Sequence, residues 1–201
     1  MSAQRLYAVA ALEHGDAGPL VPNTDLLVYK ELGAVVSEAP WQRPAGDARD
    51  VDAYRAVIEA AFARRTILPA PVGTTFRSED GLRKWLVLHY VSLADGLGFV
   101  EGRAMARVRV VAAPSPDGGT AGGMRAAELF REMRRHAVAA IPHPRPEGAA
   151  DVLMSSFLVE RERWAAFEGA VAQLGRQAPG LDVRLSGPWP PYDFVRLQFG
   201  G

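Results

Sequence analysis

The sequence predicts an α+β fold of two small domains, and three observations lead to this prediction. The chain has 201 residues, 48% of them hydrophobic, which is enough for one large core or two small ones. Apolar residues alternate in some segments and recur at helical spacing in others, so both halves mix strands with helices. Glycines gather between residues 96 and 102, and we place the boundary there, with domains spanning residues 1–99 and 100–201.

Strands are expected to open the first domain. Residues 5–12 form an apolar run that we interpret as a strand rather than a secretory leader, because the run is short and follows a single basic residue. The runs 26–29 and 32–37 meet at Lys30-Glu31, either as a strand pair or as one bulged strand. The later segments are a short strand at residues 66–68 and a loop at residues 73–76.

Two helices are expected to complete the first domain. One spans about residues 50–65 and keeps its apolar side chains on one face. The other begins after Ser78, a suitable N-cap, and carries a stripe of apolar residues as far as Leu93. We expect this second helix to end at Gly96 and Gly98, because glycine is a poor helix former.

The second domain is predicted to alternate strands with helices. Its expected strands are residues 103–111, 152–160 and 181–185, its expected helices are residues 124–140 and 161–177, and a proline-rich connector is expected at residues 142–146. A helix after a strand usually packs back on the sheet, so both helices should cover one face of a small sheet. This α+β arrangement is ferredoxin-like.

The stretch from Ser186 to Tyr192 combines three prolines with two large aromatic residues. Proline fixes φ and has no amide donor, so we expect a stiff, extended arm that lies outside any sheet ladder. Trp189 and Tyr192 on this arm are either anchors that pack the end of the chain on its own domain or a docking surface for a partner. We favour the anchor, because buried aromatic side chains close a small sheet effectively.

The composition argues against several classes of function. Lysine plus arginine and aspartate plus glutamate number 23 each, so no net positive charge is present to bind nucleic acid. The chain has no cysteine, which excludes disulfides, thiolate nucleophiles and cysteine-ligated metals and fits a reducing cytoplasm. No apolar run approaches the roughly 20 residues needed to span a membrane.

Motifs of catalytic and metal sites are missing from the sequence as well. The four histidines show no metal-ligand spacing, and we expect His143, which lies between two prolines, at the surface. The serines lack the surroundings of a nucleophile, and the glycine-rich segment 117–123 lacks the spacing of a phosphate-binding loop. We therefore predict that the chain is not an enzyme and has no catalytic residue, metal site or cofactor.

One charged pattern suggests a partner. Arg103, Met105, Arg107 and Arg109 alternate with alanine and valine, which predicts a half-buried strand with an arginine-rich exposed face. The next helix adds arginines at positions 125, 131, 134 and 135. Together these arginines could bind an acidic partner, or neighbouring glutamates and solvent could neutralise them.

The C-terminal stretch resembles a known signature. Gly187-Pro188-Trp189-Pro190-Pro191-Tyr192-Asp193-Phe194-Val195 is similar to the GPWPPY-x-FV motif of the gas vesicle GvpL/GvpF family. Segments 6–9, 31–37, 68–78 and 156–159 resemble further family segments in the same order. The resemblance therefore covers nearly the whole chain.

The resemblance implies a non-enzymatic role and a cytoplasmic, gas vesicle associated protein. Family members are accessory proteins that contact the small shell protein and other accessory proteins, and their fold is a two-domain α+β fold with a modified ferredoxin-like C-terminal domain. The implied function is assistance in nucleation or assembly of the gas vesicle shell. Our candidate partner-binding residues are Trp189, Tyr192, Arg103, Arg107 and Arg109.

An alternative function remains open from the residues alone. A ferredoxin-like regulatory module could bind a small ligand between its sheet and the glycine-rich segment 117–123, without any role in gas vesicles.

Overall fold

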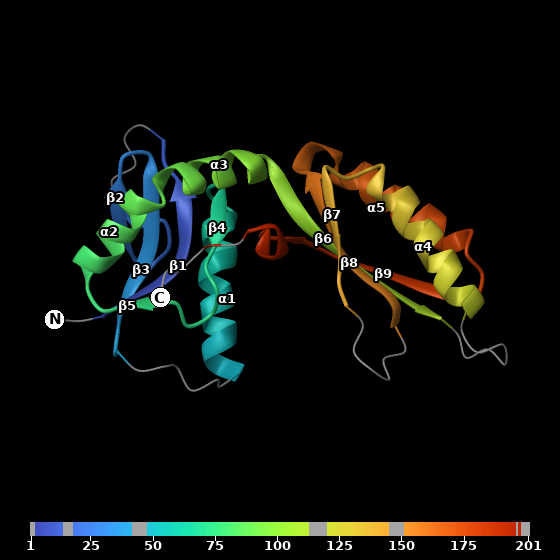
Figure 1. Ribbon diagram of the computed structural model, residues 1–201, viewed down its shortest axis with the longest axis horizontal. Helices are drawn as coiled ribbons and strands as arrows, with labels where there is room; N and C mark the ends of the chain where they lie inside the picture. The colour runs from blue at the N-terminus through green and yellow to red at the C-terminus, as the bar shows by residue number, and fades with distance from the viewer. Residues whose placement is uncertain are drawn as a thin grey trace. The chain divides into compact units, whose positions relative to one another are not determined.

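The computed structural model describes residues 3–13, 18–41, 48–112, 120–144, 151–195 and 197, and it divides into two compact units (Figure 1). Unit 1 comprises Met1–Glu101 together with Val195–Gly201, and unit 2 comprises Gly102–Phe194. Each unit combines helices with one antiparallel sheet, so the predicted α+β class is confirmed.

The sheet of unit 1 has five strands in the order β2-β3-β1-β4, with β5 also paired to β1. The strands are β1 (Ala3–Ala11), β2 (Asp25–Tyr29), β3 (Leu32–Ala39), β4 (Ile67–Pro69) and β5 (Thr75–Phe76). β2 and β3 form an antiparallel hairpin, and Lys30 in its turn has a φ of 53°. Of the two alternatives for this region, the strand pair is confirmed and the single bulged strand is wrong.

Three helices pack on this sheet (Figure 1). They are α1 (Ala48–Phe62), α2 (Glu79–Leu88) and α3 (Tyr90–Val100). α2 and α3 cover one core with buried leucines, among them Leu82, Leu86, Leu93 and Leu97. α1 is fixed to β1 by Tyr54, whose hydroxyl donates to the carbonyl oxygen of Leu6 over 2.5 Å.

The prediction for residues 73–76 is wrong in part. Thr75 and Phe76 form β5 and pair with Arg5 and Gln4 of β1. Two residues are too few to show the alternation that indicates a strand, so only the tertiary pairing reveals this element.

The predicted end of the second helix is also wrong. The helical stretch breaks at His89 and then continues as α3 past Gly96 and Gly98 to Val100. Leu97 and Val100 are buried, so packing outweighs the cost of about 1 kcal/mol that each glycine brings to a helix.

Unit 2 follows the order strand, helix, two strands, helix, strand. Its elements are β6 (Arg103–Ala112), α4 (Thr120–Arg134), β7 (Ala139–Pro142), β8 (Asp151–Glu160), the 3-10 turn η1 (Arg161–Arg163), α5 (Trp164–Arg176), β9 (Leu181–Trp189) and the 3-10 turn η2 (Tyr192–Phe194). The sheet order is β7-β8-β6-β9, with all neighbours antiparallel. This is the ferredoxin-like β-α-β-β-α-β pattern.

β7 is a strand that the sequence did not predict. We expected a helix as far as residue 140, but α4 ends at Arg134 and residues 139–142 pair with β8. Val138 and Ile141 are β-branched and fit a strand, and Pro142 is tolerated because β7 lies at the sheet edge.

The proline arm also differs from the prediction. β9 continues through Pro188 to Trp189, which pairs with Met105 of β6, so this part of the arm lies inside the ladder. The register shifts between Met105 and Arg107, where β9 carries one extra residue. A proline is accommodated there because β9 is an edge strand and the pairing is irregular.

Candidate functional site

The two faces of β6 have different surroundings. Ala106, Val108 and Val110 pack into the core beneath α4 and α5, which lie along one face of the sheet in Figure 1. Arg107 and Arg109 therefore belong to the opposite, helix-free face. Arg109 is exposed and Arg107 is half-buried, as the alternation predicted for a half-buried strand.

Met105 is an exception to this pattern. It was expected among the exposed residues of β6, but it is 1% exposed. It pairs with Trp189 of β9 and with Leu158 of β8, which is itself fully buried. The end of β6 nearest to Met105 is therefore covered on both faces.

The predicted arginine surface is split by the sheet. Arg125, Arg131, Arg134 and Arg135 belong to α4 and the turn after it, on the covered face, whereas Arg107 and Arg109 belong to the helix-free face. The expectation that all these arginines act together is wrong, because a strand and the helix that packs on it expose opposite sides. On the helix-free face, Arg109 lies opposite Arg184 of β9 instead.

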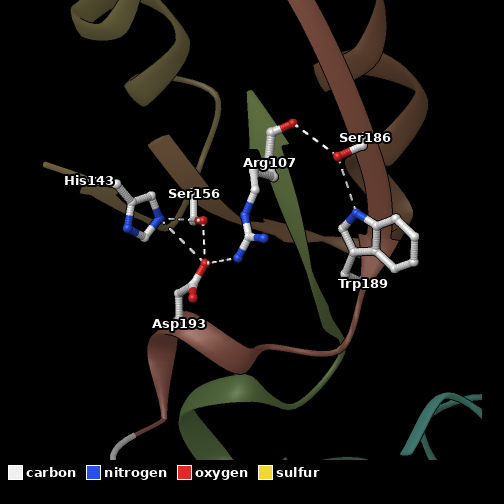
Figure 2. A network of polar contacts seen from close by, with 6 residues as sticks. All are labelled: Arg107, His143, Ser156, Ser186, Trp189 and Asp193. Atoms are coloured by element: carbon white, nitrogen blue, oxygen red, sulfur yellow. Dashed lines mark hydrogen bonds and ion pairs between the residues drawn. The ribbon is translucent and has the colours of Figure 1, made fainter. Parts of the chain in front are cut away.

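A polar network joins η2 to this face (Figure 2). The carboxylate of Asp193, in η2, accepts a hydrogen bond from Arg107 Nη2 at 2.7 Å and from Ser156 Oγ at 2.5 Å. His143 Nε2 lies 2.8 Å from Ser156 Oγ and 3.4 Å from Asp193 Oδ2. The expectation that His143 is a surface residue of a connector is wrong, since its side chain is 21% exposed and enters this network.

The network favours the ionised form of Asp193. Burial by itself would raise the pKa of this carboxyl group. The hydrogen bonds from Ser156 and Arg107, with the nearby charge of Arg107, outweigh burial and hold the pKa of Asp193 below its usual range. At neutral pH the network therefore contains a carboxylate held by a guanidinium.

Serine, histidine and aspartate meet here, but their geometry is not that of a nucleophilic triad. A triad serine gives its proton to histidine, whose other ring nitrogen is held by the carboxylate. Here Ser156 donates its only hydroxyl proton to Asp193, and the same histidine nitrogen faces both the serine and the carboxylate. The arrangement fastens η2 to β6 and β8, and it does not give Ser156 a histidine base.

The aromatic residues of the arm lie in different positions. Trp189 is half-buried, and its indole nitrogen donates to Ser186 Oγ at 3.3 Å, which in turn lies 3.5 Å from the carbonyl oxygen of Arg107 (Figure 2). Tyr192 is half-buried at the start of η2, and the two prolines between the aromatic residues are buried. The arm is thus packed on unit 2 rather than extended away from it.

Gly187 is a position in the arm where the structure requires glycine. Its φ is 133°, in the region that favours glycine. A Cβ atom there would lie 2.7 Å from Trp164 Cη2 and 2.8 Å from the carbonyl oxygen of Met105. No residue with a side chain fits without displacing the backbone of β6.

Asp193, Ser156 and His143 were missed by the sequence analysis. Two signals could have pointed to this contact. Asp193 directly follows the aromatic-proline motif, Gly187-Pro188-Trp189-Pro190-Pro191-Tyr192, and Arg107 faces outward on a central strand where it requires a counter-charge. The pairing itself could not be foreseen, because Arg107 and Asp193 are 86 residues apart in the sequence.

Other candidate sites receive little support within the described ranges. No group of three or more histidine, cysteine, aspartate or glutamate residues is placed to hold a metal among the residues that the structure describes. None of the helices built from those residues combines the length and apolarity of a membrane span. Residues 117–119 of the glycine-rich segment lie outside the described residues, and residues 120–123 form the start of α4.

Comparison with known proteins gives one consistent family. The family model described as gas vesicle synthesis protein GvpL/GvpF matches residues 6–118 and 122–196. Gas vesicle protein F2 of Halobacterium salinarum (strain NRC-1) is 27% identical, over 100% of this chain and 96% of that protein. Gas vesicle protein L of Streptomyces sp. (strain CB03234) is 28% identical, over 92% of this chain and 82% of that protein.

Solved structures agree with the fold. The crystal structure of the gas vesicle protein GvpF from Anabaena sp. PCC7120 is similar with a TM-score of 0.83 and 15% identity, over 100% of this chain and 99% of that chain. That of GvpF from Microcystis aeruginosa gives a TM-score of 0.77 and 14% identity, over 98% and 100% of the two chains. At these identities the likeness concerns the fold alone.

Proposed function

This chain belongs to the GvpL/GvpF family of gas vesicle synthesis proteins, and from that premise we propose that it assists assembly of the gas vesicle shell through protein–protein contacts. The observation that carries the proposal is the family match, which runs through both units, from residue 6 to residue 196 with one short gap. A non-enzymatic role also fits the network of unit 2, in which Ser156, His143 and Asp193 do not have the geometry of a nucleophilic triad.

We place the partner contact on the helix-free face of unit 2, at the end formed by β6 and β9. Arg109 and Arg184 are both exposed and lie directly opposite each other in the ladder. Like charges at opposing positions are unfavourable for the isolated sheet, and Arg184 forms an ion pair of 2.7 Å with Asp182. Two exposed guanidinium groups side by side on neighbouring strands fit an acidic segment of a gas vesicle protein.

The other predicted contact residues are paired or half-buried within unit 2. Arg107 is engaged by Asp193, and Tyr192 is half-buried in η2. We therefore propose that Arg107 and Tyr192 position η2, while Arg109 contacts the partner. Trp189 and Arg103, both half-buried, belong at the margin of the contact.

The proposal is tested by co-precipitation of the full chain with the shell protein and each accessory gas vesicle protein from its own genome. Arg109→Glu reverses one exposed charge and should weaken binding by about tenfold or more, with a loss of salt dependence, because charges at an interface mainly steer association. The matched control is Arg131→Glu. Arg131 is exposed on the outer side of α4, which packs on the opposite face of the sheet, so this variant should bind like the wild type.

Both variants are compared with the wild type by thermal melting, so that loss of binding is separated from loss of folding. No capture of any gas vesicle protein by the wild type would overturn the proposed function. Equal binding by the Arg109 and Arg131 variants would overturn the proposed face and leave the function to be mapped elsewhere.

A further inference from the structure

A stripe of exposed apolar residues runs along the outer side of α2 and α3 in unit 1. The inner side of these helices is buried in the core, whereas Val87, Leu88 and Val91 are 50%, 79% and 67% exposed. Large apolar side chains that cluster on a surface often mark an interaction site. We call these three residues, with Lys84 and Asp95, the outer stripe.

The outer stripe has a symmetric pattern. Lys84 lies four residues before Leu88, and Asp95 lies four residues after Val91, so each charge shares a helical face with its apolar neighbour. Lys84 and Asp95 are equally distant in sequence from the break at His89 and Tyr90, and so are Leu88 and Val91. If the stripe is followed in the opposite direction, Asp95 therefore takes the place of Lys84, and Val91 takes the place of Leu88.

We propose that the outer stripe joins two copies of this chain about a twofold axis, with the helices antiparallel. In this orientation Leu88 faces the partner's Val91, and Lys84 faces the partner's Asp95. Because a twofold contact is self-complementary, each of these pairs forms twice. The parallel orientation is disfavoured, since Lys84 would then face the partner's Lys84 and Asp95 the partner's Asp95.

Both charged residues are available for this contact. Lys84 and Asp95 are exposed, and neither forms an ion pair with another residue in the described part of its own chain. By contrast, Arg83 is engaged with Glu79 on its own helix at 3.0 Å. The stripe thus offers one cation and one anion that form no ion pair with the described residues, at equal sequence separations from the break between α2 and α3.

The contact is expected to be small and reversible. A few exposed side chains from two helices correspond to an interface at or below about 1,200 Å², the range of weak, transient association. The inference goes beyond the proposed function and does not depend on it, because the outer stripe belongs to unit 1 and the proposed partner face to unit 2.

Sedimentation velocity of the full chain over a concentration series reaching about 200 µM tests the inference. The wild type should show a monomer–dimer equilibrium. Lys84→Asp and Asp95→Lys, each alone, place like charges opposite each other at both contacts and should weaken dimerisation by about tenfold or more. An equimolar mixture of these two variants should dimerise again, because every charge then faces its opposite.

Leu88→Ser should also weaken the dimer without loss of folding, since Leu88 is 79% exposed. The matched control is Val72→Ser, because Val72 is 55% exposed and lies outside the stripe. A wild type that stays monomeric throughout the series would overturn the inference. Dimerisation that is unchanged in both single charge-reversal variants would also overturn it. If the two variants fail to dimerise when mixed, the antiparallel twofold contact is refuted.

Discussion

Asp193 connects three strands of unit 2 through a single carboxylate. It binds Arg107 of β6 and Ser156 of β8, and it lies beside His143, which directly follows β7. These contacts explain how a segment with few backbone hydrogen bonds stays on the sheet. The anchor interpretation of the arm therefore gains a specific residue, one that follows the aromatic-proline motif.

Replacing Asp193 with asparagine should lower the free energy of unfolding by about 1–2 kcal/mol at neutral pH. The estimate is that of a hydrogen bond to a charged group, reduced because the site is partly open to solvent. The folded-state pKa of Asp193 is lowered, so its contribution is complete above the unfolded pKa of about 3.9 and disappears as pH falls through the folded value.

Urea unfolding of both proteins at several pH values measures this difference. The gap between wild type and Asp193→Asn should narrow below about pH 4, where the native carboxyl also becomes neutral. Asp182→Asn, in an exposed pair with Arg184, is the control and should change stability by less than about 0.5 kcal/mol. A gap that is absent or independent of pH would contradict the role given to Asp193.

Gly187→Ala should destabilise the protein by about 2–4 kcal/mol. The added Cβ meets Trp164 and the backbone of Met105, and φ at this position is unfavourable for alanine. Gly169→Ala in α5 is the control: nothing lies within 4 Å of its added Cβ, so a gain of about 0.5–1 kcal/mol is expected. Thermal melts that rank the two variants equally would contradict this account.

Single residues were predictable where a local pattern determines them. The alternation around Arg107 correctly indicated a half-buried strand. Met105 breaks the same alternation because it is buried, with 1% of its surface exposed, between Leu158 and Trp189 on the neighbouring strands, and no local pattern encodes these neighbours. The same limit explains why Asp193, His143 and Ser156 were missed, since their contact depends on three separate strands meeting.

At the scale of elements, the cap of α2 is the most direct example of local control. Ser78 Oγ accepts a hydrogen bond from the backbone nitrogen of Gly81 at 3.2 Å, as the sequence predicted. Ser78→Ala should lower stability by about 1 kcal/mol. Ser92→Ala, at an exposed position within α3, should change it by no more than about 0.5 kcal/mol. If chemical denaturation shows an equal loss of stability in the Ser78 and Ser92 variants, the cap has no special role.

Elements that the sequence did not predict are short or lie at sheet edges. β5 has two residues and β7 has four, so neither is long enough to establish a period. β9 was predicted only as far as residue 185, because prolines usually end a strand. Its continuation to Trp189 depends on the irregular pairing with β6 around Arg107, which is a tertiary feature.

For the whole molecule, the alternation of strands and helices was enough to predict the α+β class and the ferredoxin-like pattern of unit 2. The order of the strands was not predictable in full, because the predicted set lacked β7. Family membership came from a different source, the aromatic-proline motif and the ordered segments upstream of it. The family model, which spans both units, agrees with that resemblance.

The most direct test of the proposed role is complementation in the organism that carries this gene. Vesicles are counted by electron microscopy in a strain lacking the gene and in strains supplied with wild type, Arg109→Glu or Arg131→Glu at matched protein levels. The account predicts few or no mature vesicles without the gene, full recovery with wild type and Arg131→Glu, and poor recovery with Arg109→Glu. Normal vesicles in the strain that lacks the gene would contradict the account.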